Sequence, residues 1–450
     1  MNLPPKPSSR PGRASLWRYM RLFRKDILSA QPERLYRAWM AEFRTPFFRS
    51  YAINDPEIIR CVLKDRPDDF PKSDRVGEGL RPILGDSVFL TNGDLWKRQR
   101  RIIDPAFEGG RLRESFAAIN AAASECCLRL SAQSGSVINI EPEASHAAAD
   151  VIFRTLFSLP ISDETAERTY HAFRTYQRAQ PILNVGAFLP LPGWIPRGFR
   201  RPTRDAAAEI RSLIAQMTQA RQEAILSGTA PDDLATKIMT TPDPLTGKVF
   251  DVSEMVDQVA IFFLAGHETS AASLAWALYL LALYPEWQER VAEEVQSLGA
   301  LEFNDIRNLQ VTRDVFRETL RLYPPVPMMV RETTRSETFR KRIVPKAAQL
   351  VLSPWHLHRH ARLWDQPDSF DPGRWQTSEG KRCARDAYMP FSAGARVCPG
   401  AGFAMLEGVV MLASLLRSLK VELSDHPPPV PVAHLTVRSR DGIWLRIVRR

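Results

Sequence analysis

The sequence predicts a mainly α-helical fold, and three observations support that prediction. Apolar residues recur at helical spacing over most of the chain. Strand signals are short, and they cluster near the N-terminus and in the last third. The composition, 44% apolar and 25% charged over 450 residues, is that of a globular protein. Because a sheet would have to join distant segments, we expect one intertwined fold and not independent domains.

Eight long segments carry apolar residues at the spacing of a buried helix face. They predict helices over residues 112–133, 141–158, 163–179, 203–227, 252–283, 285–297, 311–322 and 400–419. The strand signals lie near residues 48–53, 328–334, 349–353 and 434–448.

The longest predicted helix, 252–283, has signals at both ends. Asp251 precedes it and Glu254 follows three residues later, which is a variant of the capping box. Pro285 closes it, because a proline disfavours helix in the residue before it. Two proline-rich stretches predict loops. One contains Pro190, Pro192, Trp194 and Pro196, and the other is Pro427–Pro429.

The chain carries a net charge of +10, which favours contact with anionic partners. Nucleic acid, an acidic membrane surface and an acidic redox protein are candidates, and a composition bias toward arginine is the alternative. The sequence shows no zinc-finger or RNA-binding strand signature, so we expect no nucleic acid partner.

Five cysteines, an odd number with no CxxC pair, argue against a zinc site and a disulfide scaffold. They favour a reducing compartment, and we expect a cytoplasmic location. No signal-type apolar core is present near the N-terminus, and no run of eighteen apolar residues occurs, so no transmembrane helix is expected.

The N-terminal segment has a pattern of its own. Apolar residues from Leu16 to Ile27 recur at helical spacing, with arginines and a lysine between them. An interfacial helix over 16–28, a transit peptide and an ordinary amphipathic helix all fit this pattern. We therefore expect residues 1–45 to form an N-terminal segment and residues 46–450 a single catalytic domain.

The chemistry is concentrated at Cys398, which lies in a glycine- and proline-rich stretch directly before the apolar helix from residue 400. Amides at a helix start and the nearby Arg396 favour a thiolate over a thiol. Gly394 and Gly400 allow the backbone to approach a large flat group closely, and Phe391 can shield it. An inert core cysteine is the alternative, and the surrounding spacing argues against it.

This stretch matches the pattern Phe-x-x-Gly-x-Arg-x-Cys-x-Gly at all five fixed positions, and so resembles the signature of the cytochrome P450 family. The resemblance runs from about residue 50 to the C-terminus. It implies an α-helix-rich prism with small β-sheets, with haem b between a long distal helix and the cysteine loop. It also implies that Cys398 is the axial ligand of the haem iron, that Arg396 faces a propionate and that Phe391 borders the cofactor.

The hexapeptide Ala265–Ser270 lies inside the predicted helix 252–283. A glycine and a threonine in mid-helix are poor choices for stability alone, although a kinked core helix would explain them. In the family this pattern crosses the distal haem face. The resemblance implies that Gly266 opens a groove for dioxygen and that Glu268 and Thr269 deliver protons. His267 occupies a variable position and is expected to be a spectator.

Glu318 and Arg321 are spaced as a helical ion pair. The resemblance implies that they join Arg374 in a buried structural triad. It also suggests that Trp96, Arg100 and Arg331 bind the haem propionates, since arginine forks suit carboxylates. His358 lies in a matching stretch and is assigned no chemistry.

The expected reaction is a monooxygenation, a hydroxylation, epoxidation or dealkylation in which one atom of O2 enters an apolar small molecule. Electrons from NAD(P)H would arrive through a separate ferredoxin or flavodoxin and its reductase. Lys381, Arg382, Arg385 and Arg396 suggest a basic docking face, with scattered solvated charge as the alternative. The rival classes are a haem sensor or electron carrier without turnover and a peroxide-using relative, and neither needs Glu268 with Thr269. The protein is expected to be a monomer.

Apolar residues dominate four segments that line the substrate pocket in this family, which favours an apolar substrate. They are Gly79–Leu90, Ile182–Trp194, Phe262–Ala265 and Val326–Val330.

Overall fold

The computed structural model describes residues 3–10, 12, 14–44, 49–108, 110–179, 201–433 and 435–450. The chain forms two compact units. The first comprises Met1–Phe70, Ile119–Ala147 and Glu268–Arg450, and the second comprises Pro71–Ala118 and Ala148–His267. Three of the four boundaries fall inside helices, which therefore contribute residues to both units: α6 (Arg111–Ala132), α7 (Ile140–Phe157) and α11 (Val252–Leu283).

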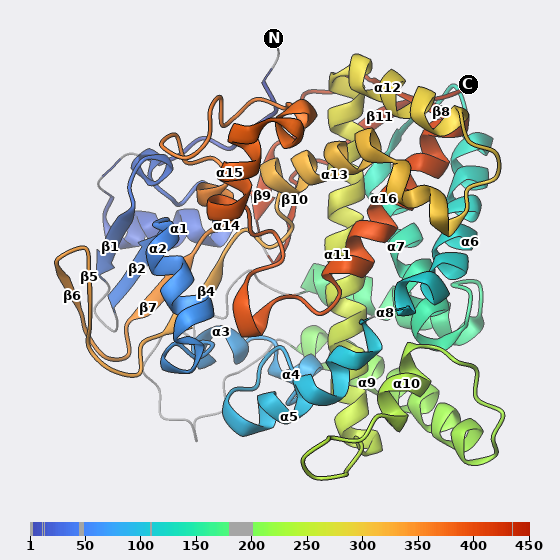
Figure 1. The fold of residues 1–450 in the computed structure, drawn as a ribbon, viewed down its shortest axis with the longest axis horizontal. Coiled ribbons are helices and arrows are strands. Elements are labelled where there is room, and N and C mark those ends of the chain that lie inside the picture. The colour runs from blue at the N-terminus through green and yellow to red at the C-terminus, as the bar shows by residue number, and fades with distance from the viewer. Residues whose placement is uncertain are drawn as a thin grey trace. The chain divides into compact units, whose positions relative to one another are not determined.

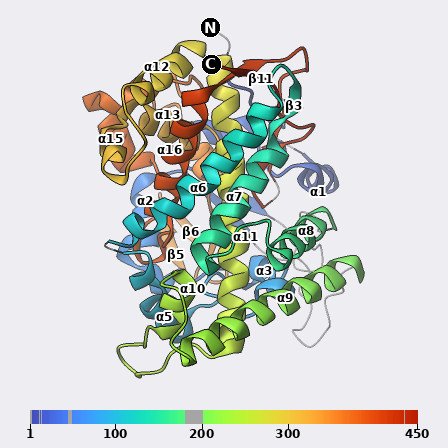
Figure 2. The same ribbon diagram turned by 90° about the vertical axis from the view of Figure 1, so that its right-hand side faces the viewer.

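The first unit contains four small sheets. Strands β1 (Met40–Arg44), β2 (Arg49–Ile53), β7 (Gln349–Leu352) and β4 (Met329–Glu332) form the largest sheet in that order. Strands β3 (Val137–Asn139), β11 (Trp444–Arg449) and β8 (Leu419–Leu423) form a second, in which β3 and β11 lie side by side (Figure 2). Two hairpins complete the set, β5 (Glu337–Phe339) with β6 (Arg342–Val344) and β9 (Pro431–Ala433) with β10 (Val437–Ser439).

Among the described residues, seven α-helices belong to the first unit alone. They are α1 (Leu16–Lys25), α2 (Pro56–Arg60), α12 (Pro285–Gln296), α13 (Gln310–Leu322), α14 (Pro354–Leu357), α15 (Ser378–Ala387) and α16 (Ala401–Ser418). Helices α13 and α16 pack closely (Figure 1), because a Cβ at Gly408 would lie 2.1 Å from the ring of Phe316. The second unit contains α3 (Asp74–Gly77), α4 (Arg81–Leu84), α5 (Gly93–Ile103), α8 (Glu164–Ala179), α9 (Arg201–Leu226) and α10 (Leu234–Thr240).

The helices predicted from periodicity are confirmed to within about two residues at each end. The capping box of α11 is confirmed as a reciprocal pair. The Glu254 amide donates to Asp251 Oδ1 at 2.8 Å, and the Asp251 amide donates to Glu254 Oε2 at 3.1 Å. The helix ends at Leu283, directly before Tyr284 and Pro285.

Two predicted elements differ from the structure. The N-terminal helix ends at Lys25 and not at residue 28, because Asp26 takes an extended conformation and accepts the amides of Leu28 and Ser29. The strand signal over 434–448 resolves into β10 and β11, separated by a turn in which Gly442 has a φ of +86°. The loop predicted around Pro190–Pro196 lies outside the described residues.

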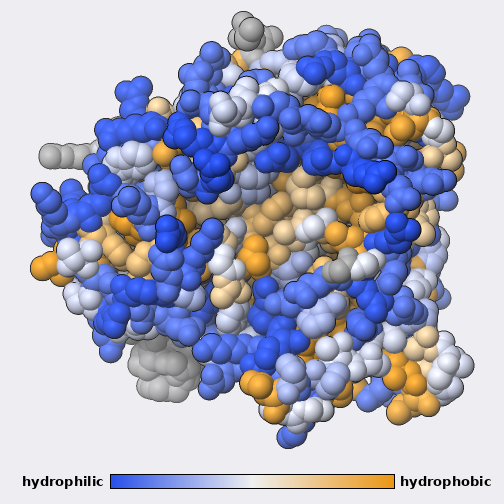
Figure 3. Space-filling view, in the orientation of Figure 1, coloured by the Kyte–Doolittle hydropathy of each residue, from blue (hydrophilic) through white to orange (hydrophobic). Residues whose placement is uncertain are grey.

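The core of the first unit gathers around the four-stranded sheet. Buried aliphatic residues of β2 and β7 pack there with Trp364 and Trp375. Among the described residues, α16 alone is long and apolar enough to match a membrane span, but 61% of it is buried inside the protein, as is typical of a core helix. On the face shown in Figure 3, hydrophilic side chains cover most of the surface and hydrophobic ones gather in patches between them.

Candidate functional site

The loop before Cys398 is held in a strained path. Ser392 and Gly394 have positive φ values of 64° and 68°. A Cβ at Gly394 would lie 1.9 Å from the carbonyl oxygen of Leu63, so glycine is required there by both conformation and space. The Cys398 amide donates to the Phe391 carbonyl at 2.9 Å and closes the loop. Phe391 is half-buried, and Cys398 lies at the protein surface, three residues before α16 begins.

Two arginines of the first unit lie close to each other. Arg331, on β4, is 6% exposed. Its pKa is lowered to about 10, first by burial and then by the charge of Arg396. Arg396 Nη1 donates to the carbonyls of Pro67 and Phe70, at 2.7 and 3.3 Å. The structure thus brings Arg331 and Arg396, both expected at a propionate, within electrostatic reach of each other.

Arg331 supplies a test of whether these residues fit a haem. Its Nε is buried and has no hydrogen-bond partner among the described residues, and none of their carboxylates pairs with it. A buried cation beside a second cation is costly unless an anion compensates it. A porphyrin propionate has the charge and the acceptor geometry for a guanidinium. The chemistry of this part of the site therefore fits haem.

Glu268 is buried, and its carboxylate faces the C-terminal hairpin. Oε2 accepts a hydrogen bond from Thr436 Oγ1 at 3.1 Å and forms an ion pair with Arg438 of β10. Oε1 is buried and has no partner among the described residues. The sequence did not reveal Thr436 and Arg438 as neighbours of Glu268, because about 170 residues separate them and no local pattern marks the pairing.

Thr269 lies next to Glu268 on α11 and is half-buried, and its carbonyl accepts the hydroxyl of Ser273 at 2.7 Å. Within the second unit, His267 is fully buried against Tyr170 and Phe263. At Gly266 the Ile152 side chain of α7 packs against α11, because a Cβ there would lie 2.4 Å from the end of that side chain. The groove for dioxygen that the resemblance implies at this glycine stays a prediction.

The next residue of α11, Ser270, donates to Glu407 Oε2 of α16 at 2.6 Å. Glu407 is buried, and burial raises its pKa to about 8. This acid therefore carries a proton near neutral pH. Sequence reasoning missed it, although a lone glutamate in the apolar helix predicted over 400–419 was a usable signal.

The structure brings Glu318, Arg321 and Arg374 together. Arg321 donates to both oxygens of Glu318, at 2.9 and 2.8 Å, and Arg374 Nε donates to Oε1 at 2.9 Å. The Asp371 amide donates to the same oxygen at 3.0 Å. The remaining Arg321 N–H groups donate to backbone carbonyls, including that of His358. Both oxygens of this buried carboxylate are thus occupied.

His358 connects the triad to the segment that leads into the cysteine loop. Its Nε2 accepts the Met389 amide at 2.9 Å, so the proton resides on Nδ1, which lies 3.1 Å from the Arg321 carbonyl. Burial, and next the charge of Arg321, lower the pKa of His358 to about 3. Neutral His358 is therefore a structural residue, a role that the sequence did not reveal.

Trp96 and Arg100 lie one turn apart on α5, in the second unit. Trp96 is buried, with the Lys72 ammonium 5.6 Å from its ring centre. Arg100 Nε lies 2.8 Å from Asp104, one turn further along the chain. The structure therefore gives both residues neighbours within their own unit.

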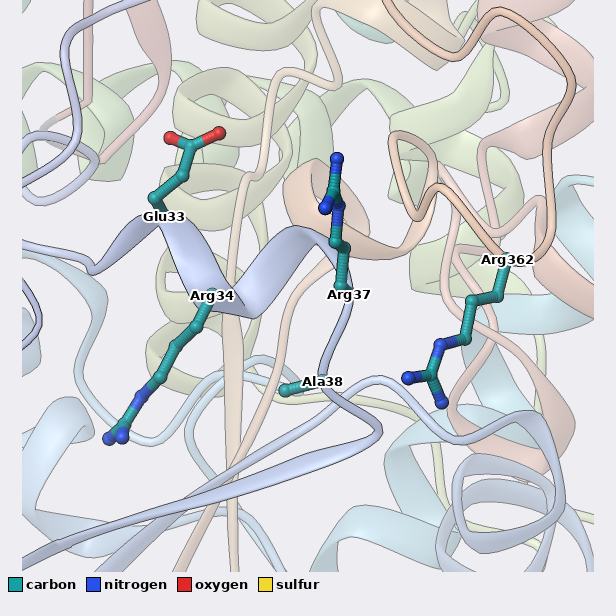
Figure 4. A pocket seen from close by; sticks show the side chains of 5 residues that line it. All are labelled: Glu33, Arg34, Arg37, Ala38 and Arg362. Atoms are coloured by element: carbon teal, nitrogen blue, oxygen red, sulfur yellow. The ribbon is translucent and has the colours of Figure 1, made fainter.

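A surface pocket of about 550 Å³ lies elsewhere in the first unit. It is lined by Glu33, Arg34, Arg37, Ala38 and Arg362. Figure 4 shows that the three guanidinium groups point in different directions. The pocket is therefore part of a basic surface and not a site in which several donors converge on one ligand.

Comparison with known proteins agrees with this geometry. The cytochrome P450 family model matches residues 36–444. Cyclooctat-9-en-7-ol 5-monooxygenase of Streptomyces melanosporofaciens is 33% identical, over 84% of this chain and 81% of that protein. Pentalenene oxygenase of Streptomyces avermitilis is 30% identical, over 89% and 88%. The fold matches the haem domain of a mutant of cytochrome P450DA with a TM-score of 0.83 at 22% identity, over 100% of this chain and 98% of that one.

These matches extend over almost the whole chain, and they agree with the helix-rich architecture with small sheets. The family's cofactor is haem, and its reaction consumes O2 and electrons that separate redox partners pass from NAD(P)H. The chain belongs to the cytochrome P450 family and is a haem-thiolate monooxygenase that inserts one oxygen atom of O2 into an apolar small molecule.

Proposed function

We propose that Cys398 is the axial thiolate of the haem iron and that Arg331, Arg396, Phe391, Trp96 and Arg100 hold the haem. The observation that carries this proposal is the buried guanidinium of Arg331, within electrostatic reach of Arg396, whose Nε has no partner among the described residues, although its Nη1 donates to the Val330 carbonyl. Haem, when bound, supplies the iron at which O2 is reduced, and a thiolate ligand favours cleavage of its O–O bond. The protein supplies orientation and proton flow.

The test is a spectrum of the reduced protein with carbon monoxide. Wild-type protein should show the strongly red-shifted Soret band of thiolate ligation, and Cys398→Ser should lose it while Cys383→Ser keeps it. Cys383 is the matched control, because it is buried on α15 and its thiol donates a hydrogen bond to the Leu363 carbonyl. A red-shifted band in Cys398→Ser would overturn the assignment.

Glu268 and Thr269 are proposed to deliver the protons that oxygen reduction consumes. The support is a buried carboxylate with a free oxygen next to a half-buried hydroxyl on one helix. Replacing Thr269 by Ala should uncouple the reaction, so that peroxide forms at the expense of product. Ser273→Ala, one turn along α11, is the control and should stay coupled. Unchanged coupling in Thr269→Ala would remove the threonine from the proton path.

The substrate is proposed to be an apolar terpene-like hydrocarbon or alcohol, as the names of the two Streptomyces relatives suggest. The side chains of Phe262, half-buried on α11, and of buried Leu90 lie on two segments expected to line the pocket. The segment Ile182–Trp194 lies outside the described residues. Screening pentalenene-like alkenes against polar analogues of equal size for displacement of the iron-bound water would test this class. Equal responses from the polar analogues would contradict it.

The electron donor is proposed to be an acidic ferredoxin or flavodoxin, served by its reductase. Lys381, Arg382 and Arg385 of α15 are exposed, and Lys64 is exposed beside the cysteine loop, within 3.1 Å of a Cβ position at Gly394. Glu379 pairs with Arg382 at 2.7 Å, so the net positive charge of α15 is smaller than its arginines suggest. Ferredoxin-driven turnover should fall as salt rises. Turnover independent of ionic strength would exclude this docking face.

Residues 16–28 are proposed to touch an anionic membrane surface peripherally. Tyr19 and Phe23 pack inward, with Tyr19 stacked on Phe43, so the outer face of α1 carries Trp17, 83% exposed, among basic residues. An indole beside arginines suits the headgroup region. Wild-type protein should float with vesicles that contain phosphatidylglycerol and not with neutral ones. Trp17→Ala should weaken this binding, whereas Trp444→Ala, also on the surface, should not.

We further propose a cytoplasmic monomer in which residues 46–450 act as one catalytic domain. Five free cysteines fit a reducing compartment. The N-terminal segment is anchored to the first unit by Lys6, 2.9 Å from Asp368, and by Asp26, which accepts the Ala433 amide. Light scattering of the purified protein tests the monomer, and cell fractionation tests the location.

A further inference from the structure

Two charged residues, Arg438 and Glu141, lie near Glu268, the proposed proton donor. Arg438 of β10 pairs with Glu268 of α11, and Thr436 donates to the same carboxylate oxygen. On the other side of Arg438 in the chain, the Ser439 amide donates to Oε1 of Glu141, at the start of α7, at 3.0 Å. One short strand thus contacts two glutamates.

Glu141 lies within electrostatic reach of Glu268 and Arg438. Its pKa is raised above the ordinary value, mainly by burial and further by the charge of Glu268, whereas the Ser439 amide and Arg438 act to lower it. Arg438 therefore pairs with Glu268 and also acts electrostatically on Glu141. Arg438 is 37% exposed, so it connects buried Glu268, which is 5% exposed, to solvent.

The charges of Glu141 and Arg438 affect how freely Glu268 can move. If Glu268 turned toward Thr269, Arg438 would lose the carboxylate with which it pairs. Glu141 would then remain as a nearby negative charge for Arg438, which favours this movement of Glu268. When Glu268 takes a proton from solvent, Glu141 and Arg438 keep opposite charges, and Glu268 can pass this proton to the Thr269 hydroxyl as that hydroxyl gives up its own proton to the reaction. Loss of that proton restores the original charges.

We propose that Glu141 is a positioning residue for proton delivery, and that it shares Arg438 with Glu268 so that the Glu268 carboxylate can turn toward Thr269. The proposal rests on the proposed role of Glu268 and Thr269. It assigns a role in the reaction to a residue on α7 and to the β9–β10 hairpin.

The decisive variant is Glu141→Gln, which keeps the acceptor for the Ser439 amide and removes the charge. Turnover should fall about 10-fold, a part of the 10²- to 10⁴-fold that a positioned proton donor contributes. The solvent deuterium isotope effect on turnover should rise, because proton transfer becomes more rate-limiting. Glu143→Gln is the matched control. Glu143 lies two residues along α7 and pairs with Arg129 at 3.2 Å, so turnover and isotope effect should stay at wild-type values.

A double-mutant cycle tests whether Glu141 acts through the arginine. In an Arg438→Gln background, Glu141→Gln should have no further effect on turnover or isotope effect. A full effect of Glu141→Gln in that background would overturn the proposal. So would a Glu141→Gln enzyme that matches Glu143→Gln, or one whose turnover falls in step with its thermal stability while the isotope effect stays unchanged.

An infrared titration, which needs no turnover, tests whether Arg438 acts on Glu141. In the ferric, substrate-free protein, the infrared band of protonated carboxyls should contain a component that titrates above the ordinary glutamate range and disappears in Glu141→Gln. In Arg438→Gln that component should titrate at still higher pH. An unchanged midpoint would show that Arg438 does not act on Glu141.

Failure of the underlying function gives a different result. If Glu268 is not the donor, Glu268→Gln leaves turnover and coupling intact. If Glu268→Gln impairs turnover while Glu141→Gln behaves as wild type, the proton donor stands and only the role of Glu141 fails.

Discussion

Two buried carboxylates in the first unit satisfy their charges in opposite ways. Glu318 has both oxygens occupied, by two arginines and a backbone amide. Glu268 has one oxygen bound to Thr436 and Arg438 and the other buried without a partner among the described residues. A saturated carboxylate has no alternative position of equal energy, whereas one with a free oxygen can exchange partners. Saturation therefore marks a charge that fixes the fold, and incomplete satisfaction marks one that can move.

The largest expected effect follows from breaking the saturated cluster. Glu318→Gln should lower the free energy of unfolding by about 3–5 kcal/mol, because it leaves two buried guanidinium groups without their anion. Urea denaturation and haem content per chain would measure this loss. Glu422→Gln, which removes an exposed pair with Lys420, should change stability by less than about 0.5 kcal/mol. Equal losses of stability in the two variants would contradict a special role of Glu318 in the fold.

At Glu268 we expect the reverse of Glu318, which is a large loss of turnover and a small loss of stability. Glu268→Gln should lower product turnover about 100-fold, because an amide cannot pass on a carboxylic proton. Its unfolding free energy should fall by no more than about 1 kcal/mol, because Arg438 reaches solvent. Coupled turnover and urea denaturation of the same preparations would measure both. A stability loss as large as that of Glu318→Gln would show that Glu268 too serves the fold.

A third buried acid, Glu407, avoids a buried negative charge by keeping its proton. Glu407 has a pKa raised to about 8 by burial. Between about pH 5 and pH 8 the folded chain therefore holds a proton that the unfolded chain releases, so this residue lowers stability as pH rises through that range. Glu407→Gln should lessen the fall in unfolding free energy from pH 5.5 to pH 8 by on the order of 2 kcal/mol. Denaturation of wild type and variant at both pH values would decide, and parallel pH profiles would contradict a protonated Glu407.

Local patterns predicted much of the fold. The ends of α11 followed from Asp251, Glu254 and Pro285, because caps and prolines act within one helical turn. The small sheets were harder. The signal over 434–448 did not reveal the turn at Gly442, and β1, β3 and β8 gave no clear signal, because short strands are stabilised mainly by their partners.

In the site, too, residues in local motifs could be predicted and residues brought together by tertiary packing could not. The residues around Cys398 and the group of Glu318, Arg321 and Arg374 could be proposed from sequence, because each belongs to a recognisable motif. The neighbours of Glu268 could not. Arg438 and Glu141 come from a hairpin and a helix far along the chain, and only tertiary packing selects them. The motif identifies the acid, and the structure shows what controls it.

The close contact between Gly394 and the Leu63 carbonyl has a consequence for protein engineering. A short peptide copied from residues 391–400 would carry the thiol but lack the distant backbone that shapes the turn around it. Grafting this haem-binding loop into another scaffold therefore requires the turn at Cys61–Asp65 to be transplanted with it. Sequence libraries that vary one segment should vary the other together with it.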